Sequence, residues 1–107
     1  MKKKRKNLKK RRSNKKRKSL RSGSKEVKRL LLQENPHCDI CGSTRALQLH
    51  HIYLIRHGFV TQLEHCCLLC PTCHAEFHAR FDRYLDDVFE ENPNADFLAI
   101  YNELKTL

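Results

Sequence analysis

The chain has 107 residues, six cysteines, seven histidines and a formal net charge of +10. A chain this short buries only a modest core, which favours an additional stabilising device such as a metal site. It contains no apolar run of about 18 residues, which argues against a membrane span. Its N-terminus, MKKKRKNLKKRRSNKKRK, lacks the apolar stretch of a secretory signal. We therefore expect a soluble, cytoplasmic protein whose cysteines bind metal rather than form disulfides.

The charge is divided unevenly along the chain. Residues 1–25 hold 15 of the 22 Lys and Arg residues and no acidic residue, which leaves seven basic against 12 acidic residues in 26–107. Such a dense block of like charge cannot fold on itself. It predicts a disordered arm, 1–24, that binds polyanions by releasing counterions; a solubility or localisation tail is the alternative. The remainder, 25–107, is predicted to be one domain.

The first elements of this domain are short. Val27, Leu30 and Leu31 follow the spacing of an amphipathic helix, which should stop before Asn35-Pro36. The segment HCDICGS, 37–43, is typical of a turn. ALQLHHI, 46–52, alternates apolar and polar residues and predicts a half-buried strand. A loop is expected over 53–65, with His57 at the surface, and CCLLC, 66–70, is expected to pair with the first strand.

Two helices are predicted to complete the domain. The longer one begins near Thr72 and ends before Asn92-Pro93. Its apolar stripe consists of Phe77, Phe81, Leu85 and Val88. The last helix has Phe97, Tyr101 and Leu104 on one face. That face can pack on the domain itself, which favours a monomer, or on a second copy in a homodimer.

All the cysteines and histidines lie between residues 37 and 78. Two CxxC pairs stand out within this segment, and such pairs are the usual ligands of a tetrahedral zinc ion. The pairs are Cys38 with Cys41, and Cys70 with Cys73. The 28 residues between them exceed the spacing of a simple zinc ribbon, so this segment should form structure of its own. Cys66 and Cys67 remain outside the pattern, and at least one is expected in the core.

The histidines indicate a second metal site. His74 and His78 are one helical turn apart, so both imidazoles project from the same face. A competing arrangement joins these two histidines to Cys70 and Cys73 in a single site. The adjacent pair His50 and His51 should point to opposite faces of a strand, so one can bind a metal while the other accepts a proton. Alternatively, both are solvent-facing strand residues.

Three segments together resemble the HNH endonucleases of the ββα-metal fold in their zinc-knuckle form. The segments are CDIC, LHHI, and HCCLLCPTCH followed by His78, within 37–81. The resemblance implies an α+β fold class: a small ββα-metal domain with a four-cysteine zinc site, flanking helices and the basic arm. Small free-standing members of this family often come from phage or mobile elements, which implies a bacterial or phage-infected cell.

The resemblance also implies a role for each residue of the motif. His51 would be the general base, and His50, His74 and His78 would bind a catalytic divalent ion such as Mg²⁺, Mn²⁺, Ni²⁺ or Zn²⁺. Structural Zn²⁺ would be held by Cys38, Cys41, Cys70 and Cys73. The family usually has an asparagine five residues before the second CxxC, where this chain has His65. A histidine also donates and accepts hydrogen bonds, so we expect His65 to replace it in orienting the base.

The implied activity is hydrolysis of DNA phosphodiester bonds that leaves 5′-phosphate and 3′-hydroxyl ends. Imidazole, whose ordinary pKa is about 6.5, suits the deprotonation of water near neutral pH. Arginines near the motif are candidates for phosphate contact: Arg80, Arg83, Arg45 and Arg56. The principal alternative is a non-catalytic, zinc-stabilised nucleic-acid-binding module, and a ribosomal or RNA-associated zinc protein is a further one. No sequence-reading motif is present, so specificity would be low, directed by DNA structure, or supplied by a partner in a larger nucleic-acid-processing complex.

Overall fold

The computed structural model describes residues 20–107, so most of the predicted basic arm, 1–19, lies outside the described residues. The described part is a small mixed α/β structure with one two-stranded sheet and three α-helices. Its elements in chain order are α2 (Ser24–Glu34), β1 (Gln48–His51), β2 (Cys66–Leu69), α3 (Pro71–Glu91) and α4 (Phe97–Leu104). Two 3₁₀ turns, η1 (Ile55–His57) and η2 (Leu63–His65), lie between the strands in the segment predicted to be a loop.

The two strands pair as the sequence predicts. β1 and β2 are antiparallel, with Gln48 opposite Leu69 and His51 opposite Cys66. A single residue, Cys70, separates β2 from α3, and Pro71 occupies the first turn of that helix, where a missing N–H costs nothing. The helix therefore starts one residue before the predicted Thr72. It ends at Glu91, before Asn92-Pro93, as predicted.

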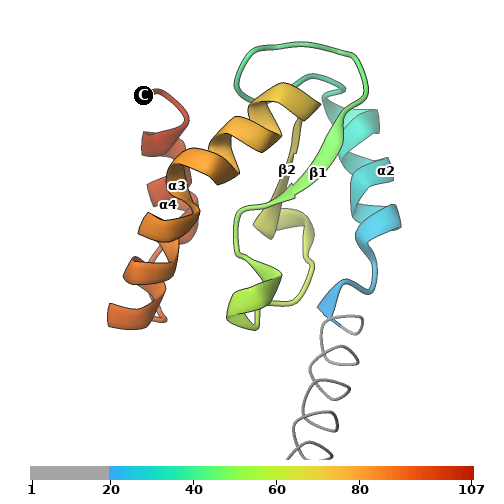
Figure 1. Cartoon of the computed structure of the whole chain (residues 1–107). Helices are drawn as coiled ribbons and strands as arrows, with labels where there is room; N and C mark the ends of the chain where they lie inside the picture. Colours follow the sequence, from blue (N-terminus) through green and yellow to red (C-terminus); the bar gives the residue numbers. More distant parts are fainter. Residues whose placement is uncertain (1–19) are drawn as a thin grey trace, which may run out of the picture.

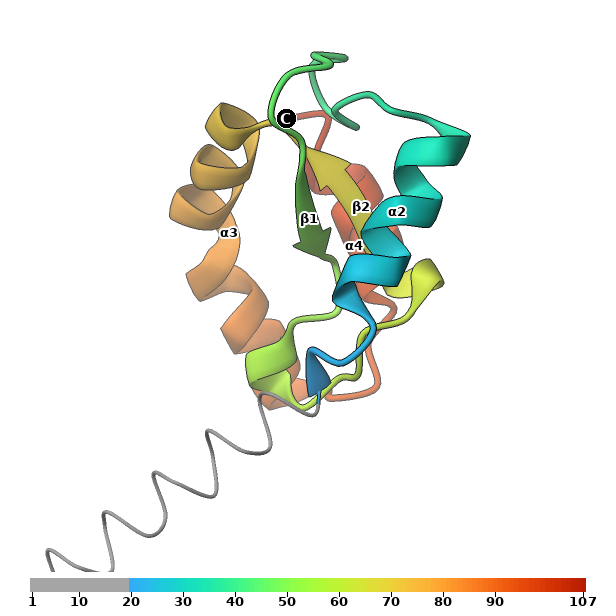
Figure 2. The ribbon, with the colours of Figure 1, turned by 90° about the vertical axis from the view of Figure 1, so that its right-hand side faces the viewer.

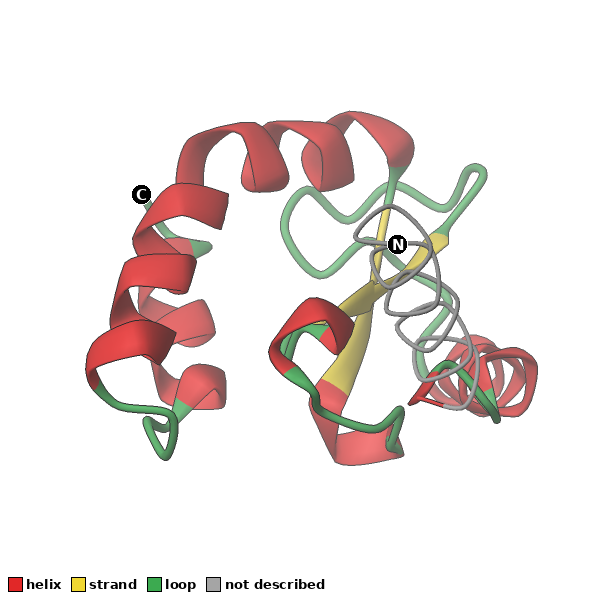
Figure 3. Ribbon diagram, turned by 60° about the horizontal axis from the view of Figure 1, so that its bottom comes forward, coloured by secondary structure: helices red, strands yellow, loops and turns green. Residues whose placement is uncertain are grey.

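The sheet lies between α2 and α3 (Figures 1 and 2). Helix α3 curves along its length, so its first half faces the sheet and its second half runs beside α4 (Figures 1 and 3). The core between these elements includes Leu69, Phe77, Leu85, Phe97 and Tyr101. The apolar stripes of both predicted helices pack on this core, with Phe81, Val88 and Leu104 only partly buried.

Contacts with the rest of the structure extend to Leu20, before the predicted boundary between residues 24 and 25. Leu20 accepts hydrogen bonds from Thr61, and Ser24 already belongs to α2. Gly23 precedes α2 with φ 88°, a conformation that glycine adopts without steric cost. Within residues 20–107, no helix combines the length and apolar character needed to cross a membrane.

Candidate metal centre

Four cysteine side chains meet where the segment between α2 and β1 reaches the start of α3. The Sγ atoms of Cys38, Cys41, Cys70 and Cys73 all lie within 4.8 Å of one another. Cys41 Sγ is 3.6 Å from Cys70 Sγ. Thiolates about 2.3 Å from one tetrahedral zinc ion are separated by about 3.8 Å, so this spacing matches the ligand geometry. The cluster can therefore hold a metal ion such as zinc, as the two CxxC pairs predict.

The local backbone favours the thiolate form of Cys38. At Cys41, by contrast, a backbone hydrogen bond is outweighed by the neighbouring thiols, which raise its pKa, and burial raises the pKa of Cys73. Gly42, at φ 80°, returns the chain so that its N–H donates to the Cys38 carbonyl at 2.9 Å. Cys70 is the N-cap of α3, and its Sγ accepts a hydrogen bond from the Cys73 N–H at 3.5 Å. Burial raises the pKa of Cys38, but backbone N–H groups, Cys41 first, outweigh it and bring that pKa to about 6. Thiolate is the form that binds zinc.

Three histidines form a second cluster beside the first. The ring nitrogens of His50 on β1 and of His74 and His78 on α3 lie within 4.8 Å of one another. His50 is only 1 % exposed, and its Nδ1 has no hydrogen-bond partner. Burial, reinforced by the neighbouring histidines, lowers the pKa of His50 to about 3, so its imidazole is neutral. A buried, neutral, unpartnered nitrogen is suited to coordinating a cation.

The outer nitrogens of the other two histidines are already engaged. His74 Nδ1 is 2.7 Å from the side-chain oxygen of Gln48, and His78 Nδ1 is 2.7 Å from Asp82 Oδ1. Because these oxygens accept, both Nδ1 atoms donate, and the two Nε2 atoms carry lone pairs at a separation of 3.1 Å. Two facing lone pairs at this distance repel unless a proton or a cation lies between them. The donor set therefore fits a bound divalent ion.

The two clusters divide adjacent residues of α3. Cys73 and His74 follow one another, but successive residues of an α-helix point about 100° apart. Cys73 joins the cysteine cluster, whereas the His74 ring lies 5.2 Å from the His50 ring between centroids. The alternative single site of two cysteines and two histidines is therefore not formed, and Cys38 and Cys41 are not left without partners.

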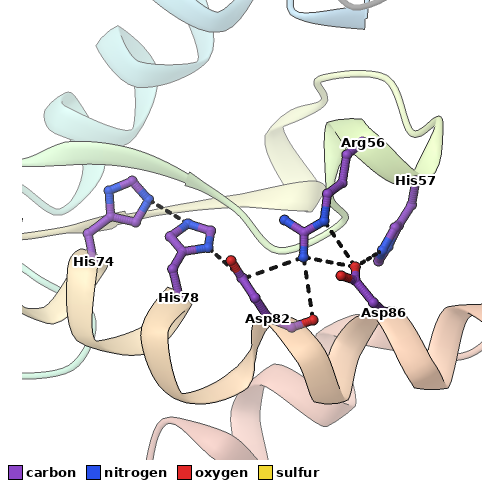
Figure 4. Close-up of polar contacts among 6 residues, drawn as sticks. All are labelled: Arg56, His57, His74, His78, Asp82 and Asp86. Atoms are coloured by element: carbon purple, nitrogen blue, oxygen red, sulfur yellow. Dashed lines mark hydrogen bonds and ion pairs between the residues drawn. The ribbon is translucent and has the colours of Figure 1, made fainter.

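A charged network extends from the histidine cluster along α3 (Figure 4). Asp82, which contacts His78, also lies 3.5 Å from the Arg56 guanidinium. Asp86 Oδ1 is 2.8 Å from Arg56 Nη2 and 2.6 Å from His57 Nε2. His57 stacks on Phe89 with ring centroids 4.3 Å apart, and its side chain is only 7 % exposed. The prediction that His57 is a surface residue is therefore wrong.

A pocket of about 390 Å³ opens next to the histidine cluster. Residues from β1, α3, the segment around η1 and the start of the described chain form its walls. They include Arg21, His51, Leu54, Arg56, His74 and His78. His50 closes the cluster from the buried side, while His51 reaches the pocket. The adjacent histidines thus have the different surroundings that strand geometry predicts.

His51 is held by a hydroxyl rather than by the cluster. Its Nε2 is 3.2 Å from Thr61 Oγ1, and the same Oγ1 donates to the Leu20 carbonyl at 2.7 Å. A hydroxyl has one proton to donate, so Thr61 accepts from His51, whose Nε2 carries hydrogen. Burial, with a contribution from the charge of Arg21, lowers the pKa of His51. The imidazole is therefore neutral, with its lone pair on Nδ1.

His65 supports the loop between the strands. Its carbonyl accepts from the Ile52 N–H at 2.7 Å, and its Nδ1 is 3.3 Å from the Val60 carbonyl. The ring lies against Tyr53, with centroids 4.2 Å apart. These contacts hold together the two ends of the segment that carries Thr61. His65 is therefore connected to His51 only indirectly, through this loop.

The predicted arginines are distributed over different surfaces. Arg56 lines the pocket, but its charge is matched by Asp82 and Asp86. Arg80 lies over the Phe81 ring at 4.8 Å and donates to the Leu107 carbonyl at 3.4 Å. Arg83 is exposed on α3, and Arg45 is exposed in the segment before β1. Arg45, Arg80 and Arg83 are not among the residues that line the pocket.

Four residues that contact the site or its pocket are missing from the sequence-based interpretation: Gln48, Asp82, Thr61 and Arg21. Two of them had a local signal. Gln48 is two residues before His50 on a strand, and Asp82 is one helical turn after His78.

No family model, curated protein or solved structure matches the chain. The interpretation of this site therefore depends on its own geometry and chemistry.

Proposed function

We propose that the protein is a metal-dependent DNA endonuclease whose β1–β2–α3 unit is an HNH-type ββα-metal domain. The observation that carries this proposal is the arrangement of two neighbouring histidines. His50 completes a three-nitrogen cluster, while neutral His51 stands outside it at the pocket, with Nδ1 as acceptor. A module that only binds nucleic acid has no use for a proton acceptor beside an incomplete ligand set.

The residues of the site would divide the hydrolysis between them. A divalent ion bound by His50, His74 and His78 would neutralise the phosphate and stabilise the leaving 3′ oxygen. His51 would take a proton from water at Nδ1 while Thr61 keeps Nε2 protonated. The resulting hydroxide attacks phosphorus in line, and the bond from phosphorus to the 3′ oxygen breaks. Solvent then protonates that oxygen, which leaves 5′-phosphate and 3′-hydroxyl ends.

The supporting residues would act by holding this geometry. Gln48 and Asp82 orient two of the cluster histidines through Nδ1, so that each Nε2 faces the cluster. The cysteine cluster anchors the start of α3 next to β1. The basic N-terminal segment supplies affinity for DNA that does not depend on sequence. No residue of the pocket is proposed to read bases, so cleavage should show little sequence preference.

The test is cleavage of supercoiled plasmid with Mg²⁺, Mn²⁺ or Ni²⁺ by the wild type, His51→Ala and His37→Ala. Loss of a general base lowers such rates by roughly 10²–10⁴-fold, so His51→Ala should leave the plasmid intact. His37 is exposed and bonds to Asn35, so His37→Ala should cleave like the wild type. Both variants must keep their zinc. If all three proteins shift the plasmid without breaking it, the protein is a binding module instead.

A further inference from the structure

The start of the described chain is fastened to the loop between the strands, one residue before Arg21, which lines the pocket. The Leu20 carbonyl accepts two hydrogen bonds from Thr61, from its N–H at 2.9 Å and from its Oγ1 at 2.7 Å. Thr61 is distant in sequence and belongs to the segment between β1 and β2, which lies beside this end of the chain (Figures 1 and 2). The 13 Lys and Arg residues of 1–19 precede this contact in the chain.

The next residue, Arg21, brings a charge to that pocket. Arg21 and Arg56 both line it, but Arg56 is paired with Asp82 and Asp86. The ion pairs among residues 20–107 do not include Arg21, which is exposed. An exposed guanidinium with no ion-pair partner attracts an anion. A phosphodiester is the anion that a guanidinium binds with matching two-point geometry.

One hydroxyl connects this arginine to His51. Thr61 Oγ1 donates to the carbonyl of Leu20, the residue before Arg21, and accepts from His51 Nε2. The orientation of the imidazole therefore depends on this hydroxyl, and the position of the arginine backbone depends on it in part. A change that removes the hydroxyl frees the imidazole and leaves Leu20 with only the hydrogen bond from the Thr61 N–H, whereas a change that keeps the hydroxyl preserves both contacts.

We propose that Arg21 binds the DNA phosphodiester in the pocket and that Thr61 is the residue that positions it together with His51. This inference deepens the proposed function and rests on it. The basic arm then has a second role besides attraction. Its last residues complete the site, and polyanion held by residues 1–19 is delivered at the pocket rather than to a remote surface.

The arginine contact is tested with the full-length chain and a short fluorescent DNA duplex. Arg21→Gln is compared with Arg29→Gln, which removes the same charge from an exposed residue of α2 that pairs with Glu26. A hydrogen bond to a charged group corresponds to roughly a 10- to 100-fold effect. We expect a loss of that size in kcat/KM, and weaker duplex binding, for Arg21→Gln, against little change for Arg29→Gln.

The positioning role is tested at Thr61. Thr61→Val keeps the shape but removes the hydroxyl, and Thr61→Ser keeps the hydroxyl. We expect kcat to fall about tenfold or more in the valine variant, by the size of a lost buried hydrogen bond, and to recover in the serine variant. A general packing defect would instead affect both variants. Equal kcat in the two variants would overturn the role of Thr61.

The outcomes separate this inference from the proposed function. If the wild type cleaves DNA and Arg21→Gln matches Arg29→Gln, the endonuclease stands and the arginine contact is overturned. If the wild type does not cleave, the endonuclease is overturned, and duplex affinity decides the contact. Weaker binding by Arg21→Gln than by Arg29→Gln then upholds the phosphate contact, and equal binding overturns it.

Discussion

The cysteine and histidine clusters share the first turns of α3 but differ in completeness. The cysteine cluster has four ligand atoms directed at one another, which is a full tetrahedral set. The histidine cluster has three, and a pocket adjoins it. Structural zinc sites are closed, whereas catalytic metal sites keep a position open for water or substrate. The start of one helix thus supplies both a closed cluster and an open one, and the number of ligand atoms distinguishes them.

The largest expected effect tests the cysteine cluster as the anchor. Zinc binding contributes roughly 10–16 kcal/mol to the folding of small zinc domains, so Cys73→Ala should lose its metal and unfold. His74→Ala should stay folded with its zinc. Metal analysis and circular dichroism measure both. Cys66→Ala is the matched control, since Cys66 is buried outside the cluster and should keep its metal. If Cys73→Ala stays folded and keeps its metal, the cysteine cluster is not required for folding, and the proposed difference between the two clusters is wrong.

The next effect concerns affinity at the histidine cluster rather than folding. Asp82→Asn replaces the carboxylate that accepts from His78 Nδ1 with an uncharged amide. Residues that orient metal ligands typically change metal affinity about 10- to 100-fold. Calorimetric titration of the zinc-loaded protein with Mn²⁺ or Ni²⁺ should show a loss of this size. Asp87→Asn, exposed on the same helix, should titrate like the wild type. Unchanged metal affinity in Asp82→Asn would show that the charged network does not influence metal binding at the histidine cluster.

A smaller effect is expected where α4 contacts the cysteine side of the domain. Tyr101 donates to Asp39 at 2.8 Å and accepts from the Cys67 thiol at 3.2 Å. Burial raises the pKa of Cys67 to about 12, so this thiol remains a donor at neutral pH. Tyr101→Phe should lower the free energy of unfolding by roughly 1–2 kcal/mol in urea. Tyr84→Phe, half exposed on α3, should change it little. Equal losses would contradict this account.

The smallest effect lies at the far end of the charged network. Burial raises the pKa of Asp86, but hydrogen bonds from His57 and Arg56 outweigh it, so the net pKa is lowered. The folded state therefore favours the carboxylate form of Asp86. Its contacts stabilise the domain fully at pH values above the pKa of Asp86 in the unfolded chain, and this stabilisation is lost as the pH falls through the lower pKa of the folded state. Asp86 is half exposed, so a double-mutant cycle of Arg56→Gln and Asp86→Asn should give a coupling of about 0.2–1 kcal/mol at pH 7. A coupling energy above this range would mean that the charged network contributes substantially to the stability of the fold.

Local spacing explains which parts of the site were predictable. Two CxxC pairs and the His74–His78 repeat are patterns within a turn or a helix, and the structure brings each set together. Asp82 is one further helical turn after His78, so the same spacing places it on the face of α3 that carries the two histidines. Arg80 is two residues after His78, about 200° around the helix, so the same rule directs it away from the pocket. These two assignments were available from helix geometry.

Contacts between distant segments had no such pattern. Nothing in the sequence relates Leu20 to Thr61, because their hydrogen bonds depend on how the loop between the strands folds. His57 was similarly hidden, since its burial depends on Phe89 and Asp86 from α3. Composition likewise gives no indication that Leu20, within the predicted basic arm, contacts Thr61.

The single-residue junction at Cys70 has a consequence for motion. Because no loop separates β2 from α3, strand and helix are joined almost rigidly, and antiparallel pairing couples β1 to both. The cysteine cluster fastens the same corner. The pocket is also lined by Leu54, Ile55 and Arg56 after β1 and by Arg21, and the residue before Arg21 is held by two hydrogen bonds from Thr61. Any widening of the pocket would therefore occur on the loop side, while the histidine cluster stays in place.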